Sequence, residues 1–439
     1  MGSAESRPGS EAQLAAVARR FGTPLYVMDA SALAQAAEQV ERAFPAPWVL
    51  HYSLKANDLP AVTGLLAERG WGANVVSVGE WELARAAGVA AGRTTVEGIG
   101  KTDADLAAVV DSAAEGRGVR WVSVESRGEL ARLTELVSHR ATAPIDVLLR
   151  LNPEVQPETS SDLAVGLPSS KFGMAADEAR AAASDVTDPN VRVRGVHVHV
   201  GSDLGDVVAW AVAGRRAVEL HEELRSSHPH ADTVDFGGGF PGLGHAPTPQ
   251  DFHAALVAEL DAAGLRMPPV CAIEPGRSVV SSAGTLVAGV LHARSRPPYP
   301  QQIVLDAGMT ELIRPALYGS RHPVTVVARA ADDANGQRHE PMSTAVEGPI
   351  CESTDSFGLH QLPRLSRGDL VALGEAGAYC ASFTSRYNGR PHPREVVLAE
   401  DGSCTLGERT DLSAPQIPPH PPQAPPVTTH RAQPERSSA

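Results

Sequence analysis

The middle of the chain alternates short apolar runs with longer amphipathic stretches. From residue 48 to residue 280, runs rich in β-branched residues are each followed by a polar turn and then by apolar residues at helical spacing. The predicted strands cover 49–55, 73–78, 94–99, 120–125, 145–151, 193–200, 233–236 and 270–274. The predicted helices cover 59–69, 80–87, 103–114, 128–137, 177–184, 207–225 and 249–263.

This alternation is typical of α/β folds. Strands joined by crossover helices pair in parallel, and eight such units over about 230 residues predict a closed (β/α)8 TIM barrel, here over residues 48–280. A doubly wound open sheet is the alternative, and a count of five or six strands would favour it.

The pattern changes after the barrel. Short strands follow one another with Gly and Pro turns and without long helices between them, which predicts a mainly β C-terminal domain over residues 281–412. Its predicted strands cover 285–292, 302–306, 324–329, 344–347, 370–373 and 395–399. The last segment, 413–439, is rich in Pro and poor in large apolar residues, so we predict a disordered tail.

The chain ahead of the barrel has two parts. Residues 1–23 form an N-terminal extension, whose first eleven residues are expected to lack structure. Residues 24–47 contain a lone strand and a helix that lead into the barrel, and Ser31 is the predicted N-cap of that helix. The lone strand is expected to pair with the β domain.

Composition and charge narrow the class of protein. The 439 residues are 42% hydrophobic, which suffices for a large core. Lys and Arg number 38 against 52 Asp and Glu, and the net charge of −14 argues against a nucleic-acid partner. No apolar run reaches the roughly 18 residues that span a bilayer, and the polar start is unlike a secretory signal. We therefore expect a cytoplasmic protein without a membrane partner.

The cysteines give no metal or redox motif. None of the four stands in a C-x-x-C pair, so we expect no metal site, and so few cysteines are typical of a reducing compartment. They are Cys271, Cys351, Cys380 and Cys404.

Candidate chemistry lies at the ends of the predicted barrel strands, where active sites of such barrels are built. Lys55 ends the first strand, and a lysine there is costly unless it is paired, used covalently or able to reach solvent. His197 and His199 share one face of the sixth strand. They could be metal ligands or core residues, but His199 is better suited to lie flat on a bound ring.

The last two strands end in groups suited to an anion and a cation. Gly237, Gly238 and Gly239 expose backbone N–H groups as a phosphate cradle would, although the run also fits a weak dinucleotide motif. Glu274 ends the eighth strand, with Arg277 as a near partner. A carboxylate that faces a pyridine nitrogen keeps the ring protonated, so these groups together predict a pyridoxal-phosphate site.

The chain from about residue 24 to 410 resembles the barrel-type (fold type III) pyridoxal-phosphate decarboxylases, the family of diaminopimelate and ornithine decarboxylases, whose barrel is of the alanine-racemase type. The Arg314 to Tyr318 and Cys351 to Ser353 motifs are similar to the diaminopimelate branch in particular. The motifs that carry the resemblance are Tyr52–Asn57, Ser170–Gly173, His197–Ser202, Gly237–Phe240, Glu274–Arg277, Arg314–Tyr318, Cys351–Ser353, Gly377–Tyr379, Tyr387–Asn388 and Arg390–Pro391.

The resemblance implies a role for each site residue. Lys55 would hold pyridoxal 5′-phosphate covalently, His199 would stack on its ring, and Glu274 would pair with the ring nitrogen. Cys351 would return a proton after carbon dioxide leaves. The phosphate would be held by Ser202, Gly237, Gly238, Gly239, Gly276, Arg277 and Tyr379. The substrate would be bound by Arg277, Arg314, Tyr318, Glu352 and Tyr379.

The resemblance also implies a homodimer with shared active sites, because Cys351 and Glu352 come from the partner subunit in this family. Two arginines suit a carboxylate and Glu352 suits an ammonium group, which together favour meso-diaminopimelate as the amino-acid substrate and L-lysine as the product.

Two residues and one loop depart from the family pattern. Asn74 stands where aspartate is usual, Asp203 stands where glutamine is usual in diaminopimelate enzymes, and the loop 156–170 lacks a common Thr-His stretch. These departures motivate an alternative: a decarboxylase of specialised metabolism that acts on another carboxylated or conjugated amino acid. A racemase and an inactive regulator with the same fold are less well supported, because Lys55, Glu274 and Cys351 are all present.

Overall fold

The computed structural model describes residues 9–140, 142–295, 297–329 and 340–407. Eight parallel strands close into a barrel in chain order, and the closing pair joins Val49 of the first strand to Ala272 of the last. The predicted (β/α)8 barrel is thus confirmed, and the open sheet is wrong. Its strands are β2 (Val49–Ser53), β3 (Gly72–Val75), β4 (Thr94–Val96), β5 (Trp121–Val124), β6 (Ile145–Leu151), β7 (Val191–Val198), β8 (Thr233–Asp235) and β9 (Val270–Ile273).

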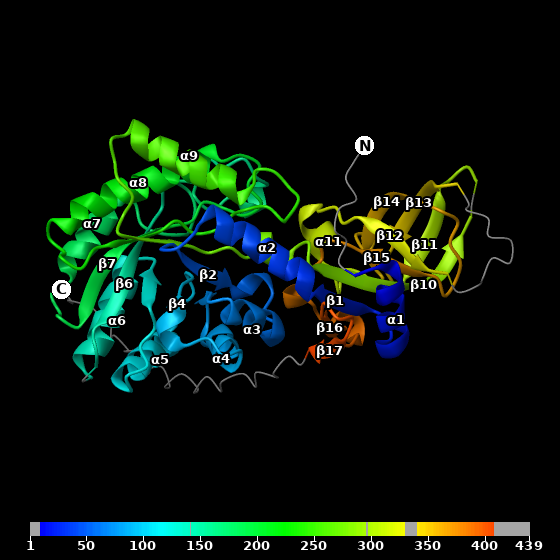
Figure 1. Ribbon diagram of the computed structural model, residues 1–439, viewed down its shortest axis with the longest axis horizontal. Coiled ribbons are helices and arrows are strands. Elements are labelled where there is room, and N and C mark those ends of the chain that lie inside the picture. The colour runs from blue at the N-terminus through cyan, green and yellow to red at the C-terminus, as the bar shows by residue number, and fades with distance from the viewer. Residues whose placement is uncertain (1–8, 141, 296, 330–339, 408–439) are drawn as a thin grey trace, which may run out of the picture. The chain divides into compact units, whose positions relative to one another are not determined.

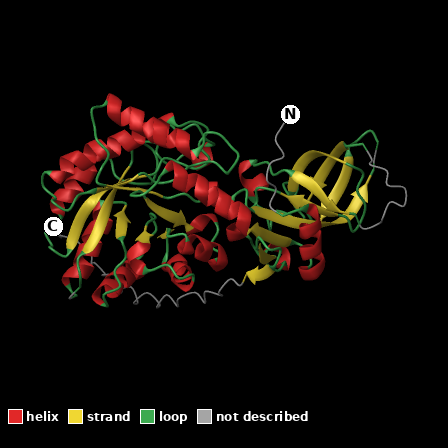
Figure 2. Cartoon of the chain, viewed as in Figure 1, coloured by secondary structure: helices red, strands yellow, loops and turns green. Residues whose placement is uncertain are grey.

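One helix joins each strand of the barrel to the next and lies outside it (Figure 1). These helices are α3 (Pro60–Glu68), α4 (Val78–Ala86), α5 (Asp103–Ala114), α6 (Arg127–Ser138), α7 (Ala176–Asp185), α8 (Val208–Arg225) and α9 (Pro249–Ala262). Figure 2 shows the same arrangement, with red helices around yellow strands. The apolar faces of the helices pack against the strands in one continuous core.

Polar side chains fix where these helices begin. Thr102 accepts a hydrogen bond from the N–H of Asp105, whose carboxylate accepts one in return from the N–H of Thr102. Thr248 and Asp251 form the same capping box ahead of α9, whose first residue is Pro249. Such caps satisfy N–H groups that have no partner inside the helix. These caps therefore fix where the loops that follow the barrel strands end and the helices begin.

The N-terminal region corrects two expectations. A helix that we did not predict, α1 (Glu11–Phe21), occupies the extension, and Ser10 and Gln13 cap it. The expectation that residues 1–11 lack structure is therefore wrong for the end of that stretch. The N-cap of α2 (Ala30–Ala43) is Asp29, not Ser31, because the Asp29 carboxylate accepts the N–H of Ser31 at 2.8 Å.

Within the described residues, the remaining strands form a nine-stranded sheet. The early strand β1 belongs to it, antiparallel to β10 and parallel to β16. Two edge strands, β14 and β17, were not predicted, because their side chains are largely exposed and lack a clear apolar alternation. The strands are β1 (Leu25–Asp29), β10 (Gly284–Arg294), β11 (Gln301–Leu305), β12 (Val324–Ala328), β13 (Met342–Glu347), β14 (Ser356–Leu362), β15 (Leu370–Leu373), β16 (Arg394–Leu398) and β17 (Cys404–Gly407).

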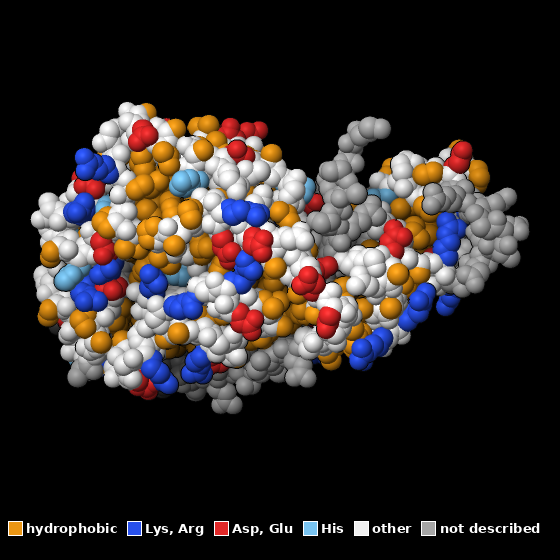
Figure 3. Space-filling model, viewed as in Figure 1, with side chains coloured by type: hydrophobic (Ala, Val, Ile, Leu, Met, Phe, Trp, Pro, Cys, Tyr) orange, Lys and Arg blue, Asp and Glu red, His pale blue; other side chains and the backbone are white. Residues whose placement is uncertain are grey.

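Short helices complete the chain. They are α10 (Arg277–Val280), α11 (Arg314–Tyr318) and the 3-10 turns η1 (Leu54–Ala56), η2 (Ala91–Arg93), η3 (Ser161–Leu163), η4 (Ala381–Phe383) and η5 (Tyr387–Gly389). None of the helices in the described ranges combines the length and the apolar composition needed to cross a membrane. On the face seen in Figure 3, acidic and basic side chains are interspersed. The predicted tail, 413–439, lies outside the described residues.

Candidate active site

A cavity of about 360 Å³ opens at the carboxyl ends of the barrel strands. Its walls come from the loops that follow β2, β3, β4, β6 and β7, and from β6 itself. The lining residues are Lys55, Val76, Glu97, Gly98, Ile99, Gly100, Arg150, Val165, Phe172 and His199. Two predicted site residues, Lys55 and His199, therefore share this cavity.

Lys55 lies in the turn η1 directly after β2, and its backbone is held in place. Its carbonyl oxygen accepts a hydrogen bond from the Ser382 hydroxyl at 3.3 Å, and the next carbonyl, of Ala56, accepts the N–H of Tyr379 at 2.7 Å. The Lys55 ammonium group makes no hydrogen bond or ion pair with any described residue. The Lys55 amine is therefore held in position and has no partner among the described residues.

His199 is kept neutral. Burial lowers the pKa of His199 well below its usual value, and the positive charges of Lys55 and Arg150 act in the same direction. Its Nδ1 accepts the N–H of Gly238 at 3.2 Å, so the ring proton lies on Nε2. A neutral imidazole in a fixed orientation can lie against a flat ring.

The glycines after β8 form a cradle that only glycine can form. A Cβ on Gly237 would lie 2.5 Å from the Val198 carbonyl oxygen, and the backbone φ of +67° is also unfavourable for other residues. A Cβ on Gly238 would lie 2.4 Å from the carbonyl oxygen of Glu274. The N–H of Gly237 donates to the Asp235 Oδ1 at 2.9 Å and that of Gly238 to His199, so among the three glycines the N–H of Gly239 is the one that no described residue accepts.

Glu274 lies in a cluster of buried carboxyls below the cavity. It is 3% exposed, its Oε1 has no hydrogen-bond partner in the described structure, and its Oε2 lies 3.6 Å from Nε2 of His197. Burial raises the pKa of Glu274 well above its usual range, and the nearby Asp235 and Glu97 raise it further. A hydrogen-bond donor that reaches Oε1 would therefore be strongly favoured.

The same cluster could be read as a metal-ligand set, since atoms of Glu97, His197 and Glu274 lie within 4.8 Å of one another. Burial raises the pKa of both Glu97 and Glu274. The Glu97 Oε2 instead accepts a hydrogen bond from the Asn74 amide at 3.1 Å. Burial thus disfavours two negative charges here unless a proton or another cation accompanies them.

Arg277 begins α10 and holds a second group of predicted residues together. Its Nη2 and Nε donate to the Ser202 hydroxyl at 3.1 and 3.3 Å, and its guanidinium lies 5.2 Å from the ring centre of Tyr379. Asp203 lies 3.6 Å from its Nη1. Ser202, Arg277 and Tyr379 are therefore close together.

Arg314, at the start of α11, is 6% exposed. It donates to the Ser320 hydroxyl at 3.2 Å, while its buried Nε has no partner among the described residues. Burial lowers the pKa of Arg314, and the charge of Arg277 lowers it further. Tyr318, at the end of the same helix, is half-buried. The buried and incompletely paired guanidinium favours an anionic ligand.

Cys351 and Glu352 are not brought to the Lys55 cavity within one chain. Both lie exposed in the loop between β13 and β14. The Glu352 carboxylate accepts a hydrogen bond from the Tyr387 hydroxyl at 2.8 Å. Neither residue therefore lines the Lys55 cavity of its own chain.

Comparison with known proteins decides the family. A family model described as the pyridoxal-binding domain of pyridoxal-dependent decarboxylases matches residues 30–281. The chain belongs to the pyridoxal-dependent decarboxylases. The diaminopimelate decarboxylase of Archaeoglobus fulgidus is 34% identical to it over 403 residues, covering 90% of this chain and 92% of the relative. The Aquifex aeolicus enzyme of the same name is 33% identical, with coverage of 89% and 90%.

A solved structure extends this similarity to the fold. The crystal structure of diaminopimelate decarboxylase from Helicobacter pylori complexed with L-lysine has a TM-score of 0.79 and 28% identity to this decarboxylase. The match covers 90% of this chain and 96% of that chain.

The residues of this pyridoxal-dependent decarboxylase fit its cofactor, pyridoxal 5′-phosphate. Lys55 offers an unpaired amine, and Glu274 Oε1 is a buried acceptor without a partner among the described residues. The backbone at Gly238 has no room for a Cβ. When bound, the cofactor supplies an electron sink for the bonding pair that a departing carboxylate leaves behind.

Several residues of the decarboxylase site escaped the sequence analysis. Arg150, on β6, lines the cavity, pairs with the Glu125 carboxylate and lies 4.9 Å from the Phe172 ring centre. Glu97 directly follows β4, as Glu125 follows β5. Glu125 stands at the end of the predicted strand 120–125, and that position was the signal that could have identified it. Glu97 lies inside the predicted strand 94–99, which is longer than β4 (Thr94–Val96), so its place at a strand end was hidden.

Proposed function

We propose that this decarboxylase acts on meso-diaminopimelate and produces L-lysine and carbon dioxide. The observation that carries this substrate is the buried Arg314. Its guanidinium lacks an anionic partner in the described structure, and both burial and the positive charge of Arg277 lower its pKa. Two guanidinium groups suit a distal carboxylate, and a simple diamine precursor has none. The names of the relatives agree with this substrate.

On the cofactor side, we propose that Lys55 holds pyridoxal phosphate and that His199 lies against its ring. Glu274 would accept the ring N–H. Burial favours a proton shared between Glu274 and Glu97, so that one carboxyl can be ionised for this contact. The phosphate would be bound by Ser202, Gly237, Gly238, Gly239, Gly276, Arg277 and Tyr379.

On the substrate side, we propose that Tyr318 and Tyr379 join the two arginines, and that Glu352 binds the distal ammonium group. Cys351 would donate its Sγ proton to the carbon that has lost its carboxylate. Both loop residues would come from the second subunit of a homodimer, because they are exposed and do not line the Lys55 cavity of their own chain. We propose that the enzyme works in the cytoplasm.

We also propose a division of the chain that follows from this function. The extension covers 1–23, the strand and helix that lead into the barrel cover 24–47, the cofactor barrel covers 48–280, the β domain covers 281–412, and the tail covers 413–439. The β domain carries the Arg314 and Cys351 motifs, so it would supply the substrate-specific part of the site.

A panel of amino acids tests the substrate. Purified holoenzyme should release carbon dioxide from meso-diaminopimelate much faster than from ornithine, lysine or arginine. Release from another amino acid, with none from meso-diaminopimelate, would contradict the substrate and leave the decarboxylase class intact.

One observation favours a second candidate, a related carboxylated or conjugated amino acid. Asp203 lies 3.6 Å from Arg277 and partly neutralises one of the two guanidinium groups. A substrate with a weaker distal charge would fit this arrangement. The same panel, extended to N-acylated diamino acids, separates the two candidates.

A further inference from the structure

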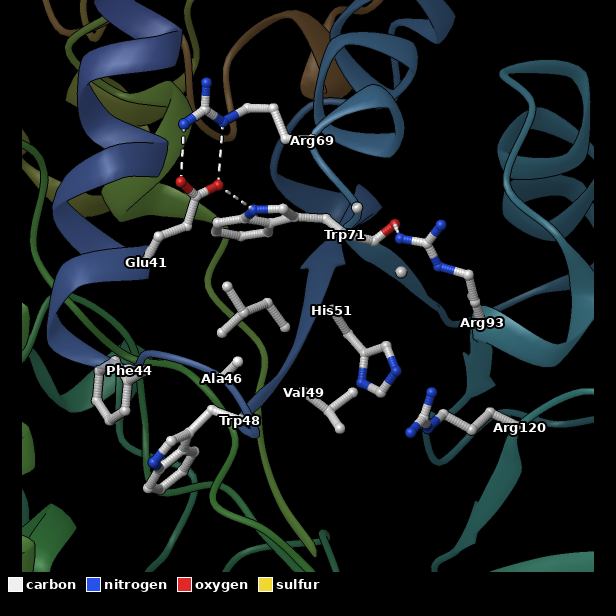
Figure 4. A pocket seen from close by; sticks show the side chains of 13 residues that line it. Glu41, Phe44, Ala46, Trp48, Val49, His51, Arg69, Trp71, Arg93 and Arg120 are labelled. Atoms are coloured by element: carbon white, nitrogen blue, oxygen red, sulfur yellow. Dashed lines mark hydrogen bonds and ion pairs between the residues drawn. The ribbon is translucent and has the colours of Figure 1, made fainter.

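A second cavity, of about 330 Å³, opens at the opposite end of the barrel from Lys55. It is lined by the amino-terminal ends of β2 and β3 and by the residues that precede β4 and β5 (Figure 4). The lining includes Trp48, Trp71, Arg69, Arg93 and Arg120. We call it the floor cavity.

The floor cavity carries excess positive charge. Arg69 is neutralised, because the Glu41 carboxylate accepts hydrogen bonds from its Nε and Nη2 at 3.0 and 2.7 Å. Arg93 donates only to the Trp71 carbonyl oxygen, at 2.9 Å, and neither it nor Arg120 has a carboxylate within ion-pair distance in the described ranges. These two guanidinium groups therefore have no carboxylate in direct contact among the described residues, although the charge of the buried Asp235 acts on Arg120 from a longer distance.

Arg120 is poorly satisfied where it lies. Its Nε is buried without a hydrogen-bond partner among the described residues, and its guanidinium rests 5.1 Å from the ring centre of Trp121. Burial lowers the pKa of Arg120, although Asp235 opposes this, and repulsion from Arg93 and Arg194 adds to the lowering. An anion between the guanidinium groups would remove this repulsion.

A buried histidine adds a second unsatisfied group. His51 is fully buried, neither ring nitrogen has a hydrogen-bond partner in the part of the chain that the structure describes, and its Nδ1 lies 3.9 Å from the Oδ2 of the buried Asp235. Figure 4 shows its ring in the cavity wall, with the Arg120 side chain directed towards it. Gly72 makes room for this ring, since a Cβ there would lie 2.5 Å from His51 Cδ2. A buried polar group without a hydrogen-bond partner is costly, so the His51 ring favours a ligand that completes its hydrogen bonds.

We propose that the floor cavity binds a small oxyanion, either a phosphate or a carboxylate, between Arg93, Arg120 and His51. Guanidinium groups bind both kinds of oxyanion through paired N–H donors, and a neutral imidazole can add one more donor. The site is separate from the cofactor site, which lies at the other end of the strands. The oxyanion neutralises the floor of the barrel and stabilises the folded holoenzyme.

Calorimetric titration tests the site. The protein is first saturated with pyridoxal phosphate, so that its cofactor phosphate site is filled, and ionic strength is held constant with sodium chloride. Sodium phosphate and sodium succinate are titrated separately, which distinguishes the two oxyanion classes. We expect saturable binding of at least one of them, weakened at least tenfold in Arg120→Gln and partly retained in Arg120→Lys. Decarboxylase activity should stay unchanged in both variants.

Two controls locate the binding. Arg140→Gln removes an exposed arginine that pairs with Asp111, and should leave the affinity unchanged. Arg314→Gln should also leave it unchanged. Loss of binding in Arg314→Gln but not in Arg120→Gln would assign the anion to the substrate site and overturn the proposal, as would the absence of binding by both anions.

A crystallographic measurement avoids any dependence on variants that fold poorly. Crystals of the wild-type holoenzyme are soaked in sodium selenate, whose selenium gives an anomalous signal. The proposal predicts a peak between Arg93 and Arg120 at the floor of the barrel. A map without a peak there would overturn it.

Discussion

Replacing Arg314 by glutamine should impair recognition of the substrate without harming the cofactor site. The side chain is 6% exposed, and its Nε has no partner among the described residues. The nearby charge of Arg277 lowers the pKa of Arg314 further than burial alone. Arg314→Gln removes the repulsion between the two arginines in the free enzyme. The substitution should therefore not lower the melting temperature of the holoenzyme.

The size of the expected loss in kcat/KM follows from the burial of Arg314. Removing one partner of a buried, hydrogen-bonded ion pair costs about 3–5 kcal/mol, and each 1.4 kcal/mol is tenfold in rate. Arg277 remains to hold part of the carboxylate, so the lower half of that range applies. We therefore expect kcat/KM for meso-diaminopimelate to fall about 10²- to 10³-fold.

A comparison of substrates makes the measurement specific. Steady-state carbon dioxide release is measured with meso-diaminopimelate and with D-lysine, which lacks the distal carboxylate. The variant should lose activity on the first substrate and change little on the second, while cofactor absorbance stays that of the wild type. A fall of similar size on both substrates, or none on either, would refute the assignment of Arg314 to the distal carboxylate.

Three further predictions concern the cofactor cradle, the loop thiol and acid stability. Gly238→Ala places a Cβ 2.4 Å from the Glu274 carbonyl oxygen, and such overpacking costs about 1–3 kcal/mol. This variant should bind the cofactor at least fivefold more weakly in a fluorescence titration. The control Gly92→Ala, whose Cβ would meet open space, should bind it as the wild type does. Cys351→Ala should slow product formation at least tenfold with the cofactor still bound, and an unchanged rate would remove its role as proton donor. Burial lowers the pKa of His322 from 6.5 to about 4, so the unfolded chain binds a proton there that the folded chain does not, and stability falls as the pH drops from 6.5 towards 4. His322→Gln should reduce the slope of unfolding free energy against pH by up to about 1.4 kcal/mol per pH unit in this window, and an unchanged slope would contradict the shift.

The barrel could be predicted because its signals are local. Each strand and helix between residues 48 and 280 has its own period, and the predicted bounds agree with β2 to β9 and α3 to α9 to within a few residues. Edge strand β14 (Ser356–Leu362) was missed for the opposite reason, since only two of its seven residues are buried and it depends on pairing with β13. Helix α1 packs its short apolar face against β12, which is far away in the sequence, and no local pattern reveals this contact.

The site was less accessible to prediction than the fold. Lys55, His199 and Glu274 follow from their places at strand ends, and the cofactor follows from their combination. The floor cavity does not, because Arg93 and Arg120 are ordinary charged residues in the sequence and become unusual only where the barrel brings them beside a buried histidine. Whether a charged side chain such as Arg93 or Arg120 has a counter-ion depends on the folded chain and cannot be read from the sequence.

We propose that this decarboxylase converts meso-diaminopimelate to L-lysine at the Lys55 site. The most direct measurement follows both products from purified holoenzyme, carbon dioxide by trapping and lysine by chiral chromatography. We predict one L-lysine for each carbon dioxide, and neither product from Lys55→Ala. Carbon dioxide without L-lysine, or the same yield from Lys55→Ala, would contradict the account.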